Sequence, residues 1–355
     1  MASTLKDVAR LAGVSLTTAS RVINNDHIHR VNPKTAKKVI EAAAELEYAP
    51  NEFARNLRKK QSSHDPVFTI GVLLTSANDS YDDSFFYDLL LGIQTEVANS
   101  GHILGFTHSF SDTSQTAVQQ ALLNNPVSGM ILLGRMSADT LHFLRKNVKH
   151  LVYAGLNSLN QQFDEVVCDS FLCAKTAVRH LAANGRKQIS FVGTAASSGS
   201  SMLLNEYRYD GYLDAMRELG LPVCKNLILD TPLSTEMAFQ AMDRALEEGL
   251  QMDGCFCAND NCAIGVLKAL HMHKKKVPQD VAVISIDDID MAAYSRPMLS
   301  TIHIPRQEIG EYSVRLLADQ IQNNRKYPIR MSLPFYVVVR ESCGEKVSKK
   351  KTFIL

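Results

Sequence analysis

In residues 4–12 the apolar side chains recur at every third or fourth position, a spacing that predicts an amphipathic helix. Thr4 suits the cap of this helix because its hydroxyl can accept a hydrogen bond from a free backbone N–H. Gly13 permits the left-handed backbone of a tight turn. Ser15 then suits the cap of a second helix over residues 16–24. The pattern therefore predicts a helix-turn-helix.

The outward face of this second helix carries side chains that suit the major groove of DNA. Ala19, Val22 and Ile23 are expected to face inward. The other face offers small, hydroxyl, amide and guanidinium groups, which can contact base edges and phosphates. These expected DNA-binding residues are Leu16, Thr17, Ser20, Arg21 and Asn24, with Thr4 and Ser15 at the helix starts. A helical hairpin with a merely solvated polar face would show the same periodicity.

A third helix is predicted after the polar loop that follows Asn24. Asn32 can cap it, and Pro33 fits its first position, where the missing N–H is harmless. Its expected core face consists of Ala36, Val39, Ile40, Ala43 and Leu46. Three short helices in residues 1–49 are consistent with a small DNA-binding headpiece.

From residue 67 onward, short apolar runs alternate with helical patterns, which predicts an α/β fold of doubly wound parallel sheets in two halves. The expected strands are 68–75, 102–108, 129–134, 151–156, 188–193, 227–230, 254–259 and 281–287. The expected helices are 85–100, one from about 113, 138–146, 172–184, 206–219, 237–248 and 262–271.

Polar residues follow several of these strands, where open α/β sheets bind their ligands. An arginine and carboxylates together offer directional donors and acceptors for the hydroxyls of a sugar, and an aromatic ring can stack on its apolar face. The expected effector-binding residues are Thr75, Phe85, Arg208, Asn259, Asp260 and Asp287. Any one of them alone would more often be a strand-end cap or a surface ion pair.

The segment TLKDVARLAGVS at residues 4–15, the pair Ser20-Arg21 and Asn24 resemble the headpiece of the LacI–GalR family of transcriptional regulators. The resemblance continues beyond Asp287. It implies a hinge helix and linker at residues 50–66, in which Ala54 and Leu57 would face the minor groove and kink the DNA.

The resemblance also implies a periplasmic-binding-protein-like core of two lobes at residues 67–343. The N-lobe would span about 67–167 and 300–330, the C-lobe about 168–299 and 331–343, and a basic tail 344–355.

Three residues match functional positions of the family. Arg208 matches its effector-contacting arginine, Asp287 its cleft aspartate and Asn259 a further polar position. Gly155 departs from the pattern, because an aspartate is common near that position, so contacts there are expected to differ. Ser285 replaces a frequent glycine, and no consequence is expected.

The charge distribution agrees with a DNA-binding headpiece. The net charge is +1, yet residues 1–64 carry a net +5 and the remainder a net −4. A basic head on a mildly acidic body fits contact with nucleic acid through the head alone. Seven cysteines without zinc spacing are expected to be free thiols, and neither a signal peptide nor a membrane span is apparent. We therefore expect a cytoplasmic protein with no cofactor and no metal.

These observations predict a homodimeric repressor of sugar-utilisation genes that binds a near-palindromic double-stranded DNA operator. A small sugar in the cleft would release it. Likeness of the stretch FDEVVCD at residues 163–169 to repressors of β-galactosidase genes favours a galactoside. The alternatives are a purine- or sugar-phosphate-responsive regulator of the same family, and a solute-binding protein. No motif of a hydrolase, a metalloprotease, a phosphate loop or a dinucleotide site is present, so an enzyme is not expected.

Overall fold

The computed structural model divides into two compact units, residues 1–66 and 67–355. It describes residues 5–23, 31–46, 66–75, 84–110, 119–120, 122, 126–134, 138–156, 158–159, 163–195, 206–344 and 353–354. The expected DNA contacts Thr4, Asn24, Ala54 and Leu57 lie outside these residues, as does the expected hinge helix.

The described part of the first unit contains three helices, α1 (Leu5–Leu11), α2 (Leu16–Ile23) and α3 (Pro33–Glu45). They enclose a small core of valines and alanines, in which Val8, Ala19 and Val39 are completely buried. Ala36, Val39 and Ala43 are buried as expected, but Ile40 is 55% exposed, because the buried face of α3 includes Ala42 instead.

The turn between α1 and α2 has the predicted chemistry. Gly13 adopts a φ of 64°, in the left-handed region that glycine enters at little cost. Ser15 caps α2, since its Oγ accepts a hydrogen bond from the Thr18 N–H at 3.1 Å. This local hydrogen bonding fixes where the second helix begins.

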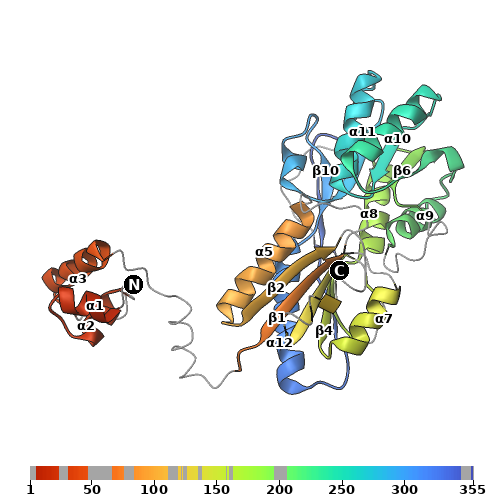
Figure 1. Cartoon of the computed structure of the whole chain (residues 1–355). Coiled ribbons are helices and arrows are strands. Elements are labelled where there is room, and N and C mark those ends of the chain that lie inside the picture. Colours follow the sequence, from red (N-terminus) through yellow and green to blue (C-terminus); the bar gives the residue numbers. More distant parts are fainter. Residues whose placement is uncertain are drawn as a thin grey trace. The chain divides into compact units, whose positions relative to one another are not determined.

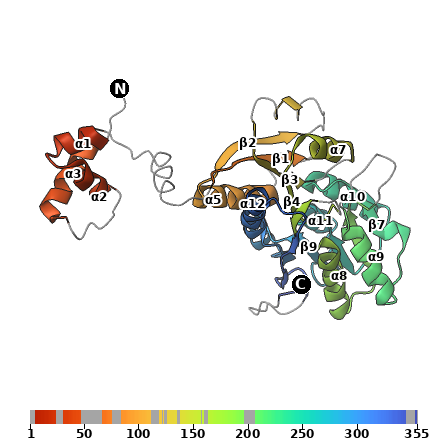
Figure 2. The ribbon, with the colours of Figure 1, turned by 90° about the horizontal axis from the view of Figure 1, so that it is seen from below.

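In the second unit, the N-lobe is a six-stranded parallel sheet in the order β11-β5-β4-β3-β1-β2. One face packs on α5 (Ser84–Asn99) and α12 (Arg306–Asn323), and the other on α7 (Ala138–Asn147) (Figures 1 and 2). Its strands are β1 (Thr69–Thr75), β2 (Ile103–Phe110), β3 (Gly129–Gly134), β4 (Leu151–Gly155), β5 (Asp164–Val167) and β11 (Arg330–Ser332).

The C-lobe is a second six-stranded sheet, in the order β12-β10-β9-β8-β6-β7, in which only β12 is antiparallel to its neighbour. Helices cover both faces: α8 (Ser170–Ala183) with α9 (Arg208–Glu218), and α10 (Thr235–Glu247) with α11 (Asp260–Met272) (Figure 1). Its strands are β6 (Ile189–Gly193), β7 (Ile228–Asp230), β8 (Gly254–Cys257), β9 (Ala282–Asp287), β10 (Ser300–His303) and β12 (Tyr336–Val338), and two 3-10 turns lie at Lys225–Leu227 and Asp290–Ala293. The doubly wound α/β architecture is thus confirmed.

The chain crosses between the lobes three times. The first crossing joins β5 to α8, as expected near residue 167. The second was expected near residue 299, but β10 pairs with β9 in the C-lobe, so the chain crosses between His303 and Arg306. The third lies between β11 and β12, because these short strands join different sheets.

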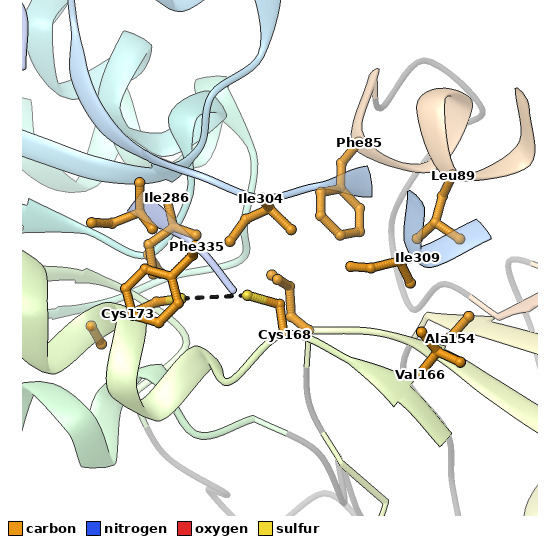
Figure 3. Close-up of a cluster of buried hydrophobic side chains, with 14 of the residues drawn as sticks. Phe85, Leu89, Ala154, Val166, Cys168, Cys173, Ile286, Ile304, Ile309 and Phe335 are labelled. Atoms are coloured by element: carbon orange, nitrogen blue, oxygen red, sulfur yellow. Dashed lines mark hydrogen bonds between the residues drawn. The ribbon is translucent and has the colours of Figure 1, made fainter. Parts of the chain in front are cut away.

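Buried apolar side chains fill the region of these crossings. Phe85 from α5 lies near Ile304 of the second crossing, and Cys168 of the first crossing lies 4.0 Å from Cys173 of α8, measured between their Sγ atoms (Figure 3). Phe335 of the third crossing is 1% exposed within the same cluster. The two lobes therefore share one continuous core where the chain passes between them.

The chain end returns to this third crossing. The Ile354 N–H donates to the Phe335 carbonyl at 2.7 Å, and the Phe335 N–H donates to the Ile354 carbonyl at 3.0 Å. Phe353 contacts the edge of Tyr336, with the ring centroids 5.2 Å apart. The end of the expected basic tail is therefore joined to Phe335 by an isolated antiparallel bridge of two backbone hydrogen bonds.

Candidate functional site

The free face of α2 is the candidate DNA-binding surface. Ala19 and Val22 are buried against the other helices, whereas Leu16, Thr17 and Arg21 are exposed. Leu16 is 42% exposed. A short helix with one buried face and these side chains on the other can enter a major groove.

Arg208, at the start of α9, is almost completely buried and held by two partners. Its Nε donates to Glu206 Oε1 at 2.7 Å, its Nη2 donates to Glu206 Oε2, and its Nη1 donates to the Ala258 carbonyl at 3.0 Å. Burial lowers the pKa of Arg208, but the Glu206 carboxylate outweighs this and raises that pKa above its ordinary value. The guanidinium thus stays charged, and it retains further N–H donors for a ligand.

Asn259 follows β8 and serves as the cap of α11. Its Oδ1 accepts a hydrogen bond from the Cys262 N–H at 2.9 Å, and it is 3% exposed. This is the local capping geometry expected of an asparagine before a helix. This cap holds the side-chain amide of Asn259 in place. The preceding residue is Ala258, whose carbonyl accepts a hydrogen bond from Arg208.

Asp260 has partners on three neighbouring segments and is completely buried. Its Oδ1 accepts hydrogen bonds from Ser285 Oγ at 2.5 Å and Thr301 Oγ1 at 2.6 Å, and its Oδ2 accepts one from the Ile289 N–H at 2.8 Å. Asp260 therefore joins α11 to β9 and β10. The expectation that Ser285 has no consequence was wrong, because its hydroxyl donates into this network.

Burial raises the pKa of Asp260 to about 6, against the opposing effect of its three hydrogen bonds. The unfolded chain would release this proton near pH 4, so the folded state binds more protons between about pH 4 and pH 6. The contribution of Asp260 to the free energy of unfolding must therefore fall as the pH rises through that window, by about 3 kcal/mol, and then level off.

Urea unfolding of the wild type and of Asp260→Asn between pH 4 and pH 7 tests this expectation. The stability difference between the two proteins should shrink or change sign across pH 4 to 6, on top of a constant offset from the lost hydrogen bonds. Ser285→Ala, which keeps the carboxyl, should retain the pH dependence. Parallel curves for the wild type and the asparagine variant would show that Asp260 does not titrate in this window.

Asp287 lies at the end of β9 with a φ of 123°, which a side-chain-bearing residue rarely adopts. Arg306 of α12 holds this turn, since it donates to the Asp287 carbonyl and, at 3.3 Å, to the Asp288 carbonyl. The same guanidinium donates to Asp88 Oδ2 of α5 at 2.9 and 2.7 Å. A strained turn at a strand end is a frequent feature of ligand sites.

Sequence reasoning missed Arg306, Asp88 and Glu206. Arg306 and Asp88 connect the N-lobe helices with the C-lobe turn at Asp287, and Glu206 orients Arg208. Arg306 and Asp88 are 218 residues apart along the chain, so no local pattern could predict their contact. The acidic residue two positions before Arg208 was a local signal that could have been used.

The two expected effector-binding residues of the N-lobe are Phe85 and Thr75. Phe85 is 6% exposed and packs edge-on against Phe86, with 5.2 Å between ring centroids, inside the cluster that joins the lobes (Figure 3). Thr75 ends β1, but its side chain lies outside the described part of the chain. Gly155 ends β4, where a Cβ would lie 2.6 Å from the Tyr153 hydroxyl, so this position has no room for a side chain without displacing the tyrosine.

The structure thus brings Arg208, Asn259 and Asp260 together at the carboxyl ends of the C-lobe strands. Asp287 ends the adjacent strand β9, and its negative charge also raises the pKa of Arg208, after burial and Glu206. Polar groups that converge at strand ends are the usual place for a ligand in such sheets. Within the described residues, no group of histidine, cysteine and carboxylate side chains is arranged to hold a metal ion.

Comparison with known proteins assigns the chain. Residues 4–51 match the model of bacterial regulatory proteins of the lacI family, and residues 178–343 match that of a periplasmic binding protein-like domain. The HTH-type transcriptional repressor CytR of Escherichia coli (strain K12) is 31% identical over 324 residues, covering 90% of this chain and 90% of that protein. The chain belongs to the LacI family.

Two further LacI-family proteins are similar over nearly the whole chain. The ribose operon repressor of Escherichia coli (strain K12) is 29% identical, covering 96% of this chain and 99% of its own length. The crystal structure of the lac repressor dimer bound to operator and the anti-inducer ONPF has a TM-score of 0.67 and 25% identity, covering 97% and 99% of the two chains. LacI-family proteins are transcriptional regulators, and the described residues of this one include no helix with the length and apolarity to cross a bilayer.

Proposed function

We propose that this LacI-family regulator is a homodimeric repressor of sugar-utilisation genes, released from its operator when a small sugar binds the core. The observation that carries the DNA-binding part is the exposed face of α2, with Leu16, Thr17 and Arg21 free of the headpiece core. The lac repressor dimer, a relative, is bound to its operator in its crystal structure. Two headpieces related by two-fold symmetry call for a near-palindromic operator.

Arg21→Ala is expected to weaken specific operator binding by about 1–3 kcal/mol, because a guanidinium contact to a base edge would be lost. The measurement is a titration of the full-length protein against duplexes selected from a random library, with an unselected duplex for comparison. Lys37→Ala removes the same charge from α3, where Lys37 lies 3.8 Å from Glu41, and it should not reduce the ratio of specific to non-specific affinity. An unchanged ratio in Arg21→Ala would contradict the recognition-face proposal.

The proposed effector contacts are Arg208, Asn259 and Asp287. Arg208 supports the proposal best, because Glu206 and the Ala258 carbonyl fix the orientation of its guanidinium group while further N–H donors remain. A planar, fixed donor set suits the neighbouring hydroxyls of a sugar ring. Asp260 is left out of the proposed contacts, since hydrogen bonds from Ser285, Thr301 and Ile289 occupy both of its oxygens.

A galactoside has no support from the residues that suggested it. The stretch that suggested it forms β5, whose acidic side chains hold the fold: Asp164 pairs with Arg325 at 2.5 Å and Glu165 with Arg330 at 2.8 Å. Both carboxylates are buried at this edge of the N-lobe sheet. These ion pairs account for both acidic side chains, so no ligand is needed to explain them.

A thermal-shift screen of the full-length protein against monosaccharides, disaccharides, sugar phosphates and purines tests the effector class. A ligand that binds only the folded state raises the melting temperature by mass action. A sugar that stabilises the protein and weakens operator binding would support the proposal. Stabilisation by purines or sugar phosphates alone would replace it with a regulator that responds to those compounds.

A further inference from the structure

A hollow of about 410 Å³ lies in the C-lobe beyond the end of α11 and is separate from the residues proposed to contact the effector. The loop after the helix and the segment Arg296–Pro297 form its walls, and Leu267 and Val277 form an apolar part of the lining that continues into the C-lobe core. Its volume falls in the usual range for small-molecule sites.

The charged lining of this hollow is entirely basic. It consists of His271, Lys274, Lys275, Lys276 and Arg296. Across the described part of the chain, the contacts place none of these five side chains in an ion pair or a side-chain hydrogen bond. Four permanent positive charges around one hollow repel each other, so an anion placed among them would be attracted by all four.

Three carboxylates of the surrounding segments each have a partner. Asp280 accepts a hydrogen bond from the Lys276 N–H at 2.7 Å, and Asp243 lies 2.8 Å from His273 Nε2. Glu341 accepts a hydrogen bond from the Met298 N–H at 2.8 Å. The charge of Asp280 offsets part of the field near Lys276, but no acidic residue lines the hollow itself.

Backbone hydrogen bonds hold the walls in place. At the end of α11, the Lys274 N–H donates to the His271 carbonyl at 3.0 Å, and the Lys275 N–H donates to the Leu270 carbonyl at 2.9 Å. Ser295 Oγ donates to the Pro297 carbonyl at 2.8 Å and so fixes the opposite wall. A lysine after a helix end can be explained by its favourable interaction with the helix dipole alone. That explanation does not apply to Arg296, because it comes from a separate segment.

We propose that this hollow binds a small organic phosphate. Lysine and arginine side chains are the usual partners of phosphate oxygens, and four cations exceed what a single carboxylate would need. The space is larger than one phosphate group, and its apolar lining can pack against the organic part of the ligand. The site would give this regulator a second ligand besides the effector.

The test uses inorganic pyrophosphate as the probe and the full-length protein in isothermal titration calorimetry without DNA. We expect saturable binding that weakens by at least about tenfold, or about 1.4 kcal/mol, in Lys274→Gln/Lys276→Gln/Arg296→Gln. The control is Lys146→Gln/Lys149→Gln, which changes two exposed lysines in and just after α7 and should bind like the wild type. Arg296→Gln alone provides a second variant if the triple variant does not fold.

Two outcomes would overturn the proposal. One is the absence of saturable pyrophosphate binding by the wild type. The other is equal affinity in the wild type and in the folded pocket variants, which would assign the binding to the basic headpiece or to non-specific charge. Because the measurement needs neither an operator nor a sugar, its failure is distinguishable from a failure of the proposed function.

Discussion

Gly310→Ala is expected to destabilise the core unit by about 3 kcal/mol, since a methyl group has no space at this helix crossing. A Cβ on Gly310 of α12 would lie 2.3 Å from the Leu89 carbonyl oxygen of α5, and one on Gly92 of α5 would lie 2.1 Å from the Gln307 carbonyl oxygen. Both neighbours are backbone atoms that cannot rotate away. The gain in helix propensity from glycine to alanine, about 1 kcal/mol, is too small to compensate.

The same substitution should disturb the proposed effector site, because α5 and α12 carry Asp88 and Arg306, which contact each other and the turn at Asp287. Thermal and urea unfolding of the full-length protein provide the measurement. Gln322→Ala, at an exposed position of the same helix, should change the stability by no more than about 0.5 kcal/mol. Equal stability of Gly310→Ala and the wild type would mean that the two helices are further apart than described.

Arg208→Ala is expected to cost about 3–5 kcal/mol of stability and to abolish the effector response. The side chain of Glu206 is only 9% exposed, and without Arg208 its buried carboxylate would lose both hydrogen bonds from the guanidinium. A proposed contact to the effector would be lost at the same time. The readouts are the melting temperature with and without the stabilising sugar, and the operator affinity, which should remain intact in the folded fraction.

A second variant separates the two effects. Arg208→Met/Glu206→Gln removes both buried charges while keeping similar volumes, so much of the lost stability should return. The effector response should remain absent in this variant. A normal response would show that Arg208 only supports the fold. Arg179→Ala, which breaks a half-exposed pair with Glu218, should cost no more than about 1 kcal/mol.

The helix-turn-helix was predictable because its determinants are local. Residues three and four apart set the buried face of α2, and the Gly13 turn and the Ser15 cap depend only on neighbours along the chain. The alternation of apolar runs and helical patterns likewise gave the two α/β lobes. The predicted burial of Ile40 was wrong, because helical spacing defines an apolar stripe but not which edge of the stripe meets the neighbouring helices.

The roles of the strand-end residues depended on the tertiary structure. Sequence placed Asp260 after a strand and Arg208 at the start of a helix, where either a ligand or the fold could use them. The fold occupies Asp260 through Ser285 and Thr301, which are 25 and 41 residues away along the chain. Arg208 depends on a glutamate only two residues away, and it keeps donors for a ligand.

By itself, the sequence determined the headpiece, the two lobes and the strand ends where polar groups gather, because these follow from periodicity and turn chemistry over a few residues. Only the tertiary structure decided how Arg306 connects Asp88 to the turn at Asp287, and that β10 belongs to the C-lobe. It also decided that glycines from α5 and α12 meet. These features join segments far apart along the chain, and their geometry is set by packing that no local pattern encodes.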